Sequence, residues 1–391
     1  MVLRTGRRRN SAITQVFLRP FTKLAVLVSD FREANDILSH RDGIDFKRGK
    51  KVDAFPTGLG PECGDIKRQF DHLVTSEGPS DLSLDMDEIV KLDILPKSPK
   101  LRALEMSEGA LSKSSYMPSP RPFHAVNDLR PSVSAAKRTI KSFVDSQVAA
   151  AVEKLHKNVE PESALDYIIH RETKSAEKSG RAPAVHDPRI LDITQCYMTA
   201  GHDTSTCSML WIMRRLMADP EQQVRIRQSL RVTYREAYNE QRVPNAQEFG
   251  KHSAYLEAFV EEVLRYNCPV PTILVMTKRD TILLGHHIPA DTQVFLNLTG
   301  PSLTTPSLTI QEQSRNHTAR MYRHKAAHDN WDDFDPAAFR PERWLRQDEQ
   351  GTMIFSPSSG PSLSLSAGNR GCWGQKLGYL EIRILSFMGD V

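Results

Sequence analysis

The sequence contains no hydrophobic run long enough to cross a bilayer as a helix. A crossing helix needs about 20 consecutive apolar residues, and the longest apolar run near the start, residues 24–28, has the length of a strand. We therefore expect no transmembrane anchor in this chain. Basic residues gather at Arg4, Arg7, Arg8 and Arg9. This cluster favours a disordered terminus, and a targeting or membrane-surface tail is the alternative.

Cysteine pairs and an excess of one charge are also lacking. The five cysteines are Cys63, Cys196, Cys207, Cys268 and Cys372. They form no C-x-x-C pair and no secretory signal precedes them, so neither a zinc site nor a disulfide framework is indicated, and we expect a reducing, intracellular compartment. Lys and Arg total 52 against 48 Asp and Glu, and the net charge of +4 gives no reason to expect nucleic acid as a partner.

The spacing of the apolar residues predicts a mainly α fold with small β-sheets. The 391 residues are enough for one large domain or two ordinary ones with a sizeable core. Helices are expected at 31–40, capped by Asp30, and at 133–159, 188–218, 221–238 and 253–266; strands at 13–30, 273–276, 281–284 and 293–298. Residues 188–218 are apolar almost all round, which predicts a helix in the middle of a domain. Less regular segments are expected as short helices with mobile loops (75–130), a polar linker (172–188), a surface insertion (302–325) and a compact meander (331–344).

A glycine-rich loop near the C-terminus delivers Cys372 to a helix. Gly368, Gly371 and Gly374 permit backbone conformations closed to other residues and a close approach to a flat ligand. We expect Cys372 in the first turn of the helix, where free amide groups stabilise a thiolate that could bind a soft metal centre. The alternative is a buried structural cysteine beside an ordinary glycine turn. The apolar positions of the helix are Leu377, Leu380, Ile384 and Phe387.

Four segments resemble the signatures of the cytochrome P-450 family, in the family's order. The loop around Cys372 matches the heme-binding pattern F-x-x-G-x-R-x-C-x-G, with Leu365 in place of Phe. Upstream of it lie AGHDTS at 200–205, which matches A/G-G-x-D/E-T-T/S, EVLR at 262–265, which matches E-x-x-R, and FRPERW at 339–344, which resembles the P-E-R-F/W element. Short patterns of this kind occur singly by chance, but their order favours the family. The resemblance covers residues from about 185 to the C-terminus well and the rest poorly.

The resemblance implies a cytochrome P-450-like fold with heme b, iron protoporphyrin IX, between the long central helix and the cysteine loop. Cys372 would ligate the iron, and its sulfur would donate electron density that favours O–O bond cleavage. The cofactor-binding residues implied by the match are Ala200, Gly201, Thr204, Leu365, Gly368, Arg370, Cys372 and Gly374. Arg370 would pair with a heme propionate; the alternative is an ordinary surface arginine.

The resemblance also implies roles on the oxygen side and in the scaffold. Thr204 would hydrogen-bond dioxygen or a nearby water and Asp203 would relay protons from solvent, as the catalytic pair. Alternatively, Thr204 bonds back to its own helix and Asp203 forms a salt bridge. Glu262, Arg265 and Arg343 resemble the family's buried charge network, which holds the meander on the thiolate side. His202 occupies a variable family position and is left unassigned.

The leading functional hypothesis is a heme-thiolate monooxygenase that inserts one oxygen atom of dioxygen into an apolar substrate, with electrons from NADPH through a separate reductase. The alternative is a truncated, inactive relative, because residues 1–185 match the family poorly and are expected to be an incomplete N-terminal part. Residues 186–391 are expected to be the heme-binding catalytic core. We expect both parts to belong to one domain. The nearest candidates for a second propionate partner are Lys67 and Arg68, but a solvated basic turn is the favoured interpretation of this segment. A helical interaction protein with chance motifs is a third reading. Family members are often bound to the endoplasmic reticulum membrane, but without an anchor a cytoplasmic or peripheral location is expected.

Overall fold

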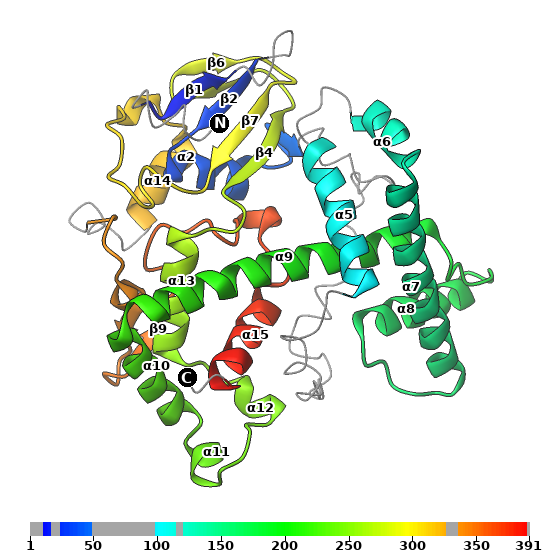
Figure 1. Cartoon of the computed structure of the whole chain (residues 1–391). Helices are drawn as coiled ribbons and strands as arrows, with labels where there is room; N and C mark the ends of the chain where they lie inside the picture. The colour runs from blue at the N-terminus through cyan, green and yellow to red at the C-terminus, as the bar shows by residue number, and fades with distance from the viewer. Residues whose placement is uncertain (1–10, 17–23, 49–97, 115–119, 326–334, 389–391) are drawn as a thin grey trace. The chain divides into compact units, whose positions relative to one another are not determined.

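The computed structural model describes residues 11–16, 24–48, 98–114, 120–325 and 335–388. The chain divides into two compact units, one of residues 1–49 and 204–391 and the other of residues 50–203. Helices predominate, and the strands that the structure describes form one five-stranded and two two-stranded sheets (Figure 1). The predicted mainly α fold with small β-sheets is therefore confirmed. The basic segment with Lys67 and Arg68 lies outside the described residues.

The first unit contains the five-stranded sheet, in the order β1-β2-β7-β4-β3. Its strands are β1 Ile13–Val16, β2 Ala25–Val28, β3 Phe46–Arg48, β4 Thr272–Thr277 and β7 Gln293–Asn297. Strands β2 and β7 are parallel and the other neighbours are antiparallel. All four residues of β2 are buried, because side chains from both faces of the sheet pack into surrounding structure. The hairpins are β5 Thr281–Leu283 with β6 His286–Ile288, and β8 Leu345–Gln347 with β9 Met353–Phe355.

Helix α2, Phe31–Asp36, and the π-helix η1, Ile37–Arg41, follow β2. The Asp30 side chain accepts a hydrogen bond from the Glu33 amide at 2.9 Å, so the predicted N-cap is confirmed. Ala34, Ile37 and Leu38 are buried in the core beneath the sheet, as their spacing predicts. This packing holds the end of η1 in place.

Glu33 on α2 is a fully buried carboxyl, and burial raises its pKa from 4.5 to about 7, against the opposing pull of Arg41, whose Nη1 lies 3.3 Å away. The folded state thus binds this proton more tightly than the unfolded state does. The stability that this group contributes is complete below about pH 4.5 and is lost as the pH rises to about 7.

We expect Glu33→Gln to remove this pH dependence, because the neutral amide keeps the shape of the protonated carboxyl. The free energy of unfolding of the wild type should fall by up to about 3 kcal/mol between pH 4.5 and 7, relative to the variant. Urea unfolding at a series of pH values measures the difference. The same slope in both proteins would mean that Glu33 does not titrate in this range.

Helix α13 of the first unit, Ala254–Tyr266, is buried at every residue from Leu256 to Arg265, and this unit contains further helices. They are α10 Pro220–Thr233, α11 Arg235–Asn239, α12 Ala246–Phe249, η4 Glu312–Ser314, α14 His317–Lys325, η5 Pro341–Trp344, η6 Gly368–Arg370 and α15 Gln375–Met388. The predicted single helix at 221–238 is wrong: it is interrupted at Tyr234, whose buried ring packs edge-on against Phe249 and Phe387.

The prediction that residues 302–325 form a surface insertion is also wrong. This segment contains α14, and it buries Leu303 and Ala319. Arg315 is buried too, and its Nη2 donates to the Asp30 carboxylate at 3.0 Å. The sequence has no regular period here because the burial comes from a few separate contacts rather than from a continuous amphipathic face.

The second unit packs α5 Pro99–Ser114, α6 Pro120–Asp128, α7 Pro131–His156 and α8 Ala164–Lys178. Its core includes Ile140, Val144 and Val148 of α7, as the predicted periodicity requires. Helix α8 was missed, and part of it falls in the predicted linker at 172–188. Its signal in the sequence is the capping box formed by Ser163 and Asp166.

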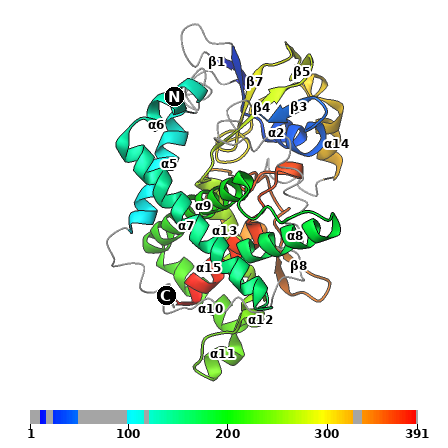
Figure 2. The ribbon, with the colours of Figure 1, turned by 90° about the vertical axis from the view of Figure 1, so that its right-hand side faces the viewer.

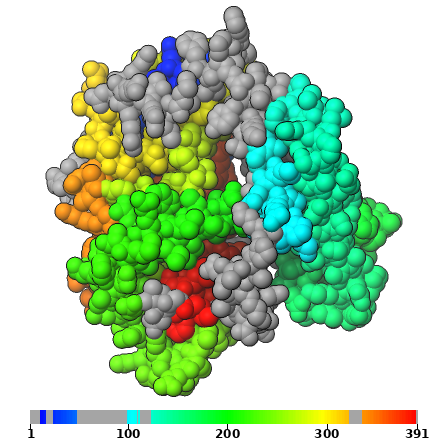
Figure 3. Space-filling view, viewed as in Figure 1, coloured from blue at the N-terminus to red at the C-terminus, as the bar shows by residue number. Residues whose placement is uncertain are grey.

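Helix α9, Pro188–Ala218, has the predicted bounds and runs from the second unit into the first. The prediction that it lies in the middle of a domain is wrong for its second half. There Leu210, Met213 and Met217 are each more than half exposed, and the green helix lies on the surface in Figure 3. Its contacts come instead from a stripe at helical spacing, formed by Ser205, Ser208, Ile212 and Arg215. In the part of the chain that the structure describes, we find no helix with the length and apolarity that a membrane span requires.

Candidate active site

Helix α15, which follows the cysteine loop, is anchored to α13 by buried polar contacts. Arg383 Nε donates to Glu257 at 2.9 Å, and the Tyr379 hydroxyl donates to Glu261. Burial raises the pKa of Glu261 and holds the pKa of Tyr379 well above its usual value, so a proton stays between these groups at neutral pH. Figure 2 shows α13 and α15 close to one another, as these bonds require. Helix α13 thereby sets the position at which the loop enters α15.

The loop itself is closed by a backbone hydrogen bond from the Cys372 amide to the Leu365 carbonyl at 2.8 Å. Gly368 has a φ of +56°, and a Cβ atom there would lie 2.8 Å from the Cα of Ser39 and closer still to the Leu38 carbonyl oxygen. Glycine is therefore required at 368 for both its conformation and the close packing on η1. In the structure, Gly368 therefore packs against another segment of the protein.

Cys372 does not lie in the first turn of α15, because the helix begins at Gln375 and Gly374 stands before it. The prediction about the first turn is therefore wrong, because a turn at Trp373 and Gly374 separates Cys372 from the helix. Of the apolar positions at helical spacing, Leu377 is 46% exposed, whereas Ile384 is buried and Phe387 packs against the rings of Tyr234 and Phe249. The start of α15 therefore presents an apolar side chain to the outside of the described structure.

Cys372 differs from the other described cysteines in its surroundings. It is exposed, whereas Cys196 and Cys207 are partly buried and Cys268 is buried. Burial raises the pKa of the Cys268 thiol to about 11, and its sulfur donates to the Val270 carbonyl at 3.1 Å, so Cys268 remains a structural thiol. Of these four cysteines, Cys372 has the accessibility that a metal ligand needs.

Arg370 makes an ion pair that the sequence did not predict. Its Nε and Nη2 donate to Oδ1 of Asp42 at 2.8 and 2.6 Å. Asp42 follows η1 directly, so this pair fastens the cysteine loop to the same segment that Gly368 contacts. The reading of Arg370 as an ordinary surface arginine is wrong, since only 12% of its side chain is exposed. Its predicted pairing with a propionate remains a prediction.

The AGHDTS segment lies in the middle of α9. Ala200 and Gly201 are exposed, and a Cβ atom on Gly201 would meet nothing within 4 Å. The Asp203 side chain is 60% exposed, with one carboxylate oxygen 3.5 Å from Nδ1 of His202. Thr204 is partly buried. These positions leave both sequence readings of Asp203 and Thr204 open.

Ser205, the next residue, connects this helix to the one that follows Cys372. Its hydroxyl donates to Oε2 of Glu381 on α15 at 3.0 Å, within the first unit. Neither residue was singled out from the sequence as a contact. Because Ser205 adjoins Thr204, this hydrogen bond ties the part of α9 that contains Thr204 to α15, the helix that follows the cysteine loop.

The structure brings Glu262, Arg265 and Arg343 together. Arg265 donates to both oxygens of Glu262, from Nη2 at 2.7 Å and Nε at 2.8 Å, and Arg343 Nε lies 3.2 Å from Oε1. The Arg340 amide and the Trp344 indole complete the set at 2.8 and 2.9 Å. The side chains of Glu262 and Arg265 have no exposed surface. These donors take the place of the water that the buried Glu262 oxygens would otherwise bind.

Arg265 extends the network to the backbone of distant segments. Its Nη1 donates to the carbonyls of Leu303 and Pro336, the latter at 2.9 Å, and its Nη2 donates to Ala338 at 3.3 Å. Trp344 was the part of the network that sequence reasoning missed, although it lies in the motif at 339–344. The signal for it was the presence of a large aromatic with an N–H donor directly after Arg343.

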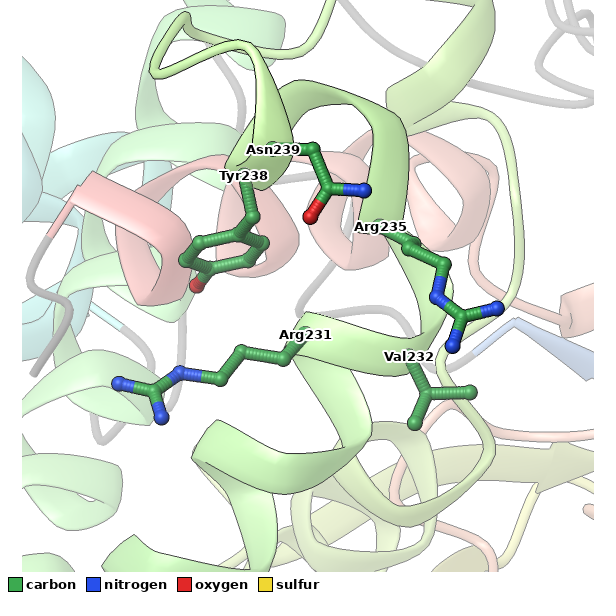
Figure 4. Close-up of a pocket in the computed structure, with 5 residues that line it drawn as sticks. All are labelled: Arg231, Val232, Arg235, Tyr238 and Asn239. Atoms are coloured by element: carbon green, nitrogen blue, oxygen red, sulfur yellow. The ribbon is translucent and has the colours of Figure 1, made fainter.

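A surface hollow lies elsewhere in the first unit, on α10 and α11. Arg231, Val232, Arg235, Tyr238 and Asn239 line it, and the two arginine side chains extend away from one another (Figure 4). None of the five belongs to the four sequence motifs. The hollow is therefore separate from the cysteine loop and takes no part in the proposal below.

The fold and these motifs define a mainly helical protein with an exposed loop cysteine, a buried Glu-Arg-Arg network and small sheets. The cytochrome P450 family model matches residues 97–302, and the chain belongs to the cytochrome P450 family. This match includes the α9 segment and the E-x-x-R pair but not the loop at 365–374. The assignment of Cys372 therefore depends on the loop's own residues and geometry.

Individual relatives agree with the family. The chain is 35% identical over 236 residues to the Hps1-dma1 cluster cytochrome P450 monooxygenase cyp3.1 of Dothistroma septosporum, covering 57% of this chain and 74% of that protein. It is 34% identical over 245 residues to cytochrome P450 monooxygenase xilC of Penicillium rubens, and 33% identical over 234 residues to cytochrome P450 monooxygenase TRI13 of Fusarium sporotrichioides. These two alignments cover 62% and 56% of this chain but only 41% and 40% of the relatives. For these two, the matched part is under half of the relative's length.

Proposed function

We propose that this chain is a heme-thiolate monooxygenase that inserts one oxygen atom of dioxygen into an apolar organic substrate. Electrons come from NADPH through a separate reductase. The observation that carries the proposal is the exposed position of Cys372 in its loop. A hydrogen bond from the Cys372 amide closes this loop, and Gly368 of the loop packs against η1. The relatives' names as monooxygenases support the reaction class.

The described residues fit a heme. The accessible thiol of Cys372 suits the soft ligation of its iron. Arg370 uses two of its donor nitrogens on Asp42, and its third nitrogen, Nη1, has no hydrogen-bond partner among the described residues, so a carboxylate can still bind there. Gly201 has no side chain, so its backbone can lie against a flat group. We therefore assign heme contacts to Ala200, Gly201, Thr204, Leu365, Gly368, Arg370, Cys372 and Gly374.

A heme held by a cysteine thiolate would promote cleavage of the O–O bond, since the sulfur donates electron density to the iron. The chain's own residues supply position and protons. The hydrogen bond from the Cys372 amide to the Leu365 carbonyl fixes the backbone that carries the thiol, and the thiol must be deprotonated to ligate iron. Asp203, open to solvent, can take up a proton, and the adjacent Thr204 hydroxyl can pass it on at the oxygen side. One oxygen goes into the substrate and the other leaves as water, which is why protons must be delivered.

The carbon monoxide spectrum of the reduced protein tests this function. We expect purified chain supplied with heme to give the strongly red-shifted Soret band of thiolate ligation. Thr204→Ala should keep this band, because the hydroxyl does not ligate iron, but should lower the product formed per electron consumed. Added peroxide should restore part of the activity of the variant, since peroxide brings its own protons.

Two outcomes would contradict the proposal. Absence of any heme band in the wild type would favour the alternative, an inactive relative. A normal band with equal coupling in wild type and Thr204→Ala would retain heme binding and remove Thr204 from the mechanism.

A further inference from the structure

Asp42 stands at the end of η1 and belongs to no motif in the sequence. We propose that Asp42 is a positioning residue for heme: it holds Arg370 by one edge and leaves the other edge of the guanidinium to a heme propionate. The inference rests on the proposed function, because it requires that the chain binds heme. It concerns how this chain orients Arg370 before any heme arrives.

The geometry of the pair supports two separate edges. Arg370 donates from Nε and Nη2 to a single oxygen of Asp42, at 2.8 and 2.6 Å. A guanidinium has five N–H donors in a rigid, planar fork, so this side-on pair consumes one edge and leaves the Nη1 and Nη2 edge unused. That end-on edge matches the two oxygens of a second carboxylate.

Burial makes Asp42 effective as an anchor. The exposed fractions of the two side chains are 12% for Arg370 and 16% for Asp42, so water screens the pair little. A free arginine side chain samples many rotamers and loses that freedom on binding, whereas Arg370 is already ordered. The expected benefit is tighter heme binding without a further contact to heme.

A second contact fixes the distance between the same two segments. Gly368 packs so closely on Leu38 and Ser39 that a Cβ atom could not be added without movement of the backbone. Arg41, next to Asp42, is itself buried, with Nε 2.8 Å from Asp45 and Nη2 bonded to the Thr281 hydroxyl. These contacts of Arg41 hold the end of η1 in place. Because Asp42 adjoins Arg41, its ion pair with Arg370 fastens the cysteine loop to this fixed segment.

Heme affinity, measured by absorbance when heme-free chain is titrated with hemin, tests the proposal without any turnover. Asp42→Ala should bind hemin about five- to tenfold more weakly, because Arg370 loses its orientation. Asp42→Asn keeps an oxygen that accepts from Nε and Nη2 and should bind within about twofold of the wild type. Asp145→Ala, which breaks an exposed pair with Lys141 on α7, is the matched control and should change nothing.

Hemin dimethyl ester separates this role from a structural one. The ester has no propionate charge, so wild type and Asp42→Ala should bind it equally well. Arg370→Lys retains the charge and the pair with Asp42 but lacks the second edge, and should lose affinity for hemin only. This variant carries the test if Asp42→Ala does not fold.

Three results would overturn the inference. Equal loss for hemin and its ester would make Asp42 merely structural, and a gain in hemin affinity for both Asp42 variants would make it a competitor of the propionate. Both leave the proposed function intact. A wild type that binds neither hemin nor the ester would overturn the proposed function, and the inference with it.

Discussion

Replacement of Cys372 by alanine is expected to abolish the thiolate-type heme spectrum completely. Iron ligation needs a deprotonated and accessible sulfur, and among the described cysteines only Cys372 is exposed. The reduced variant under carbon monoxide should show no red-shifted Soret band, whether or not some heme remains weakly bound. The far-ultraviolet circular dichroism should stay close to that of the wild type, because an exposed side chain contributes little to the core.

Cys268→Ala is the matched control for this experiment. Its sulfur is buried, and the pKa of about 11 keeps it protonated at neutral pH. The control should lose some stability, because a buried side chain is removed, but should keep the wild-type spectrum. If Cys372→Ala retained the thiolate band, the assignment of the iron ligand would be wrong.

The second large effect is expected for the buried network on α13. Removal of one partner of a buried ion pair leaves the other charge without compensation, which costs roughly 3 to 5 kcal/mol. Glu262→Ala would strand Arg265 and Arg343, and Arg265→Ala would strand Glu262 and the carbonyls of Leu303 and Pro336. Both variants should yield little soluble protein and, where it can be purified, a free energy of urea unfolding lowered by that amount.

Glu342→Ala provides a nearby comparison in the same motif. The Glu342 side chain is about half exposed and pairs with Arg225 and with the Tyr255 hydroxyl. An exposed pair contributes about 0 to 1 kcal/mol, so this variant should fold and bind heme almost normally. Equal stability losses for Glu342→Ala and Glu262→Ala would show that burial of the network is not what matters.

Much of the fold was accessible from local patterns. Asp30 was recognised as a cap because its side chain bonds to an amide three residues away, and the bounds of α9 follow from Pro188 and the Asp219-Pro220 pair. The error on α9 has a physical cause. An all-round apolar sequence shows that a helix can be buried, but its neighbours decide which faces are covered, and Leu210 and Met217 remain 64% and 73% exposed.

The candidate site was predictable to a similar extent. The motif at 262–265 places Glu262 and Arg265 one helical turn apart, so their contact follows from the geometry of one helix. The donors from Arg340 and Trp344 come from 78 and 82 residues away. Whether these donors reach Glu262 depends on how the segment at 335–344 packs on α13. No short-range spacing in the sequence specifies this packing.

The sequence alone determined the cytochrome P450 resemblance, the loop around Cys372 and the helices that carry the motifs, because these depend on residue types at short separations along the chain. Tertiary structure decided what the motif residues touch. Gly368 contacts η1, Ser205 bonds to Glu381 across 176 residues, and Arg370 pairs with Asp42 across 328 residues. Such partners are set by the packing of the sheet, η1, α13 and α15, since a charge buried in that packing must be paired by whatever side chain the fold brings within hydrogen-bond distance.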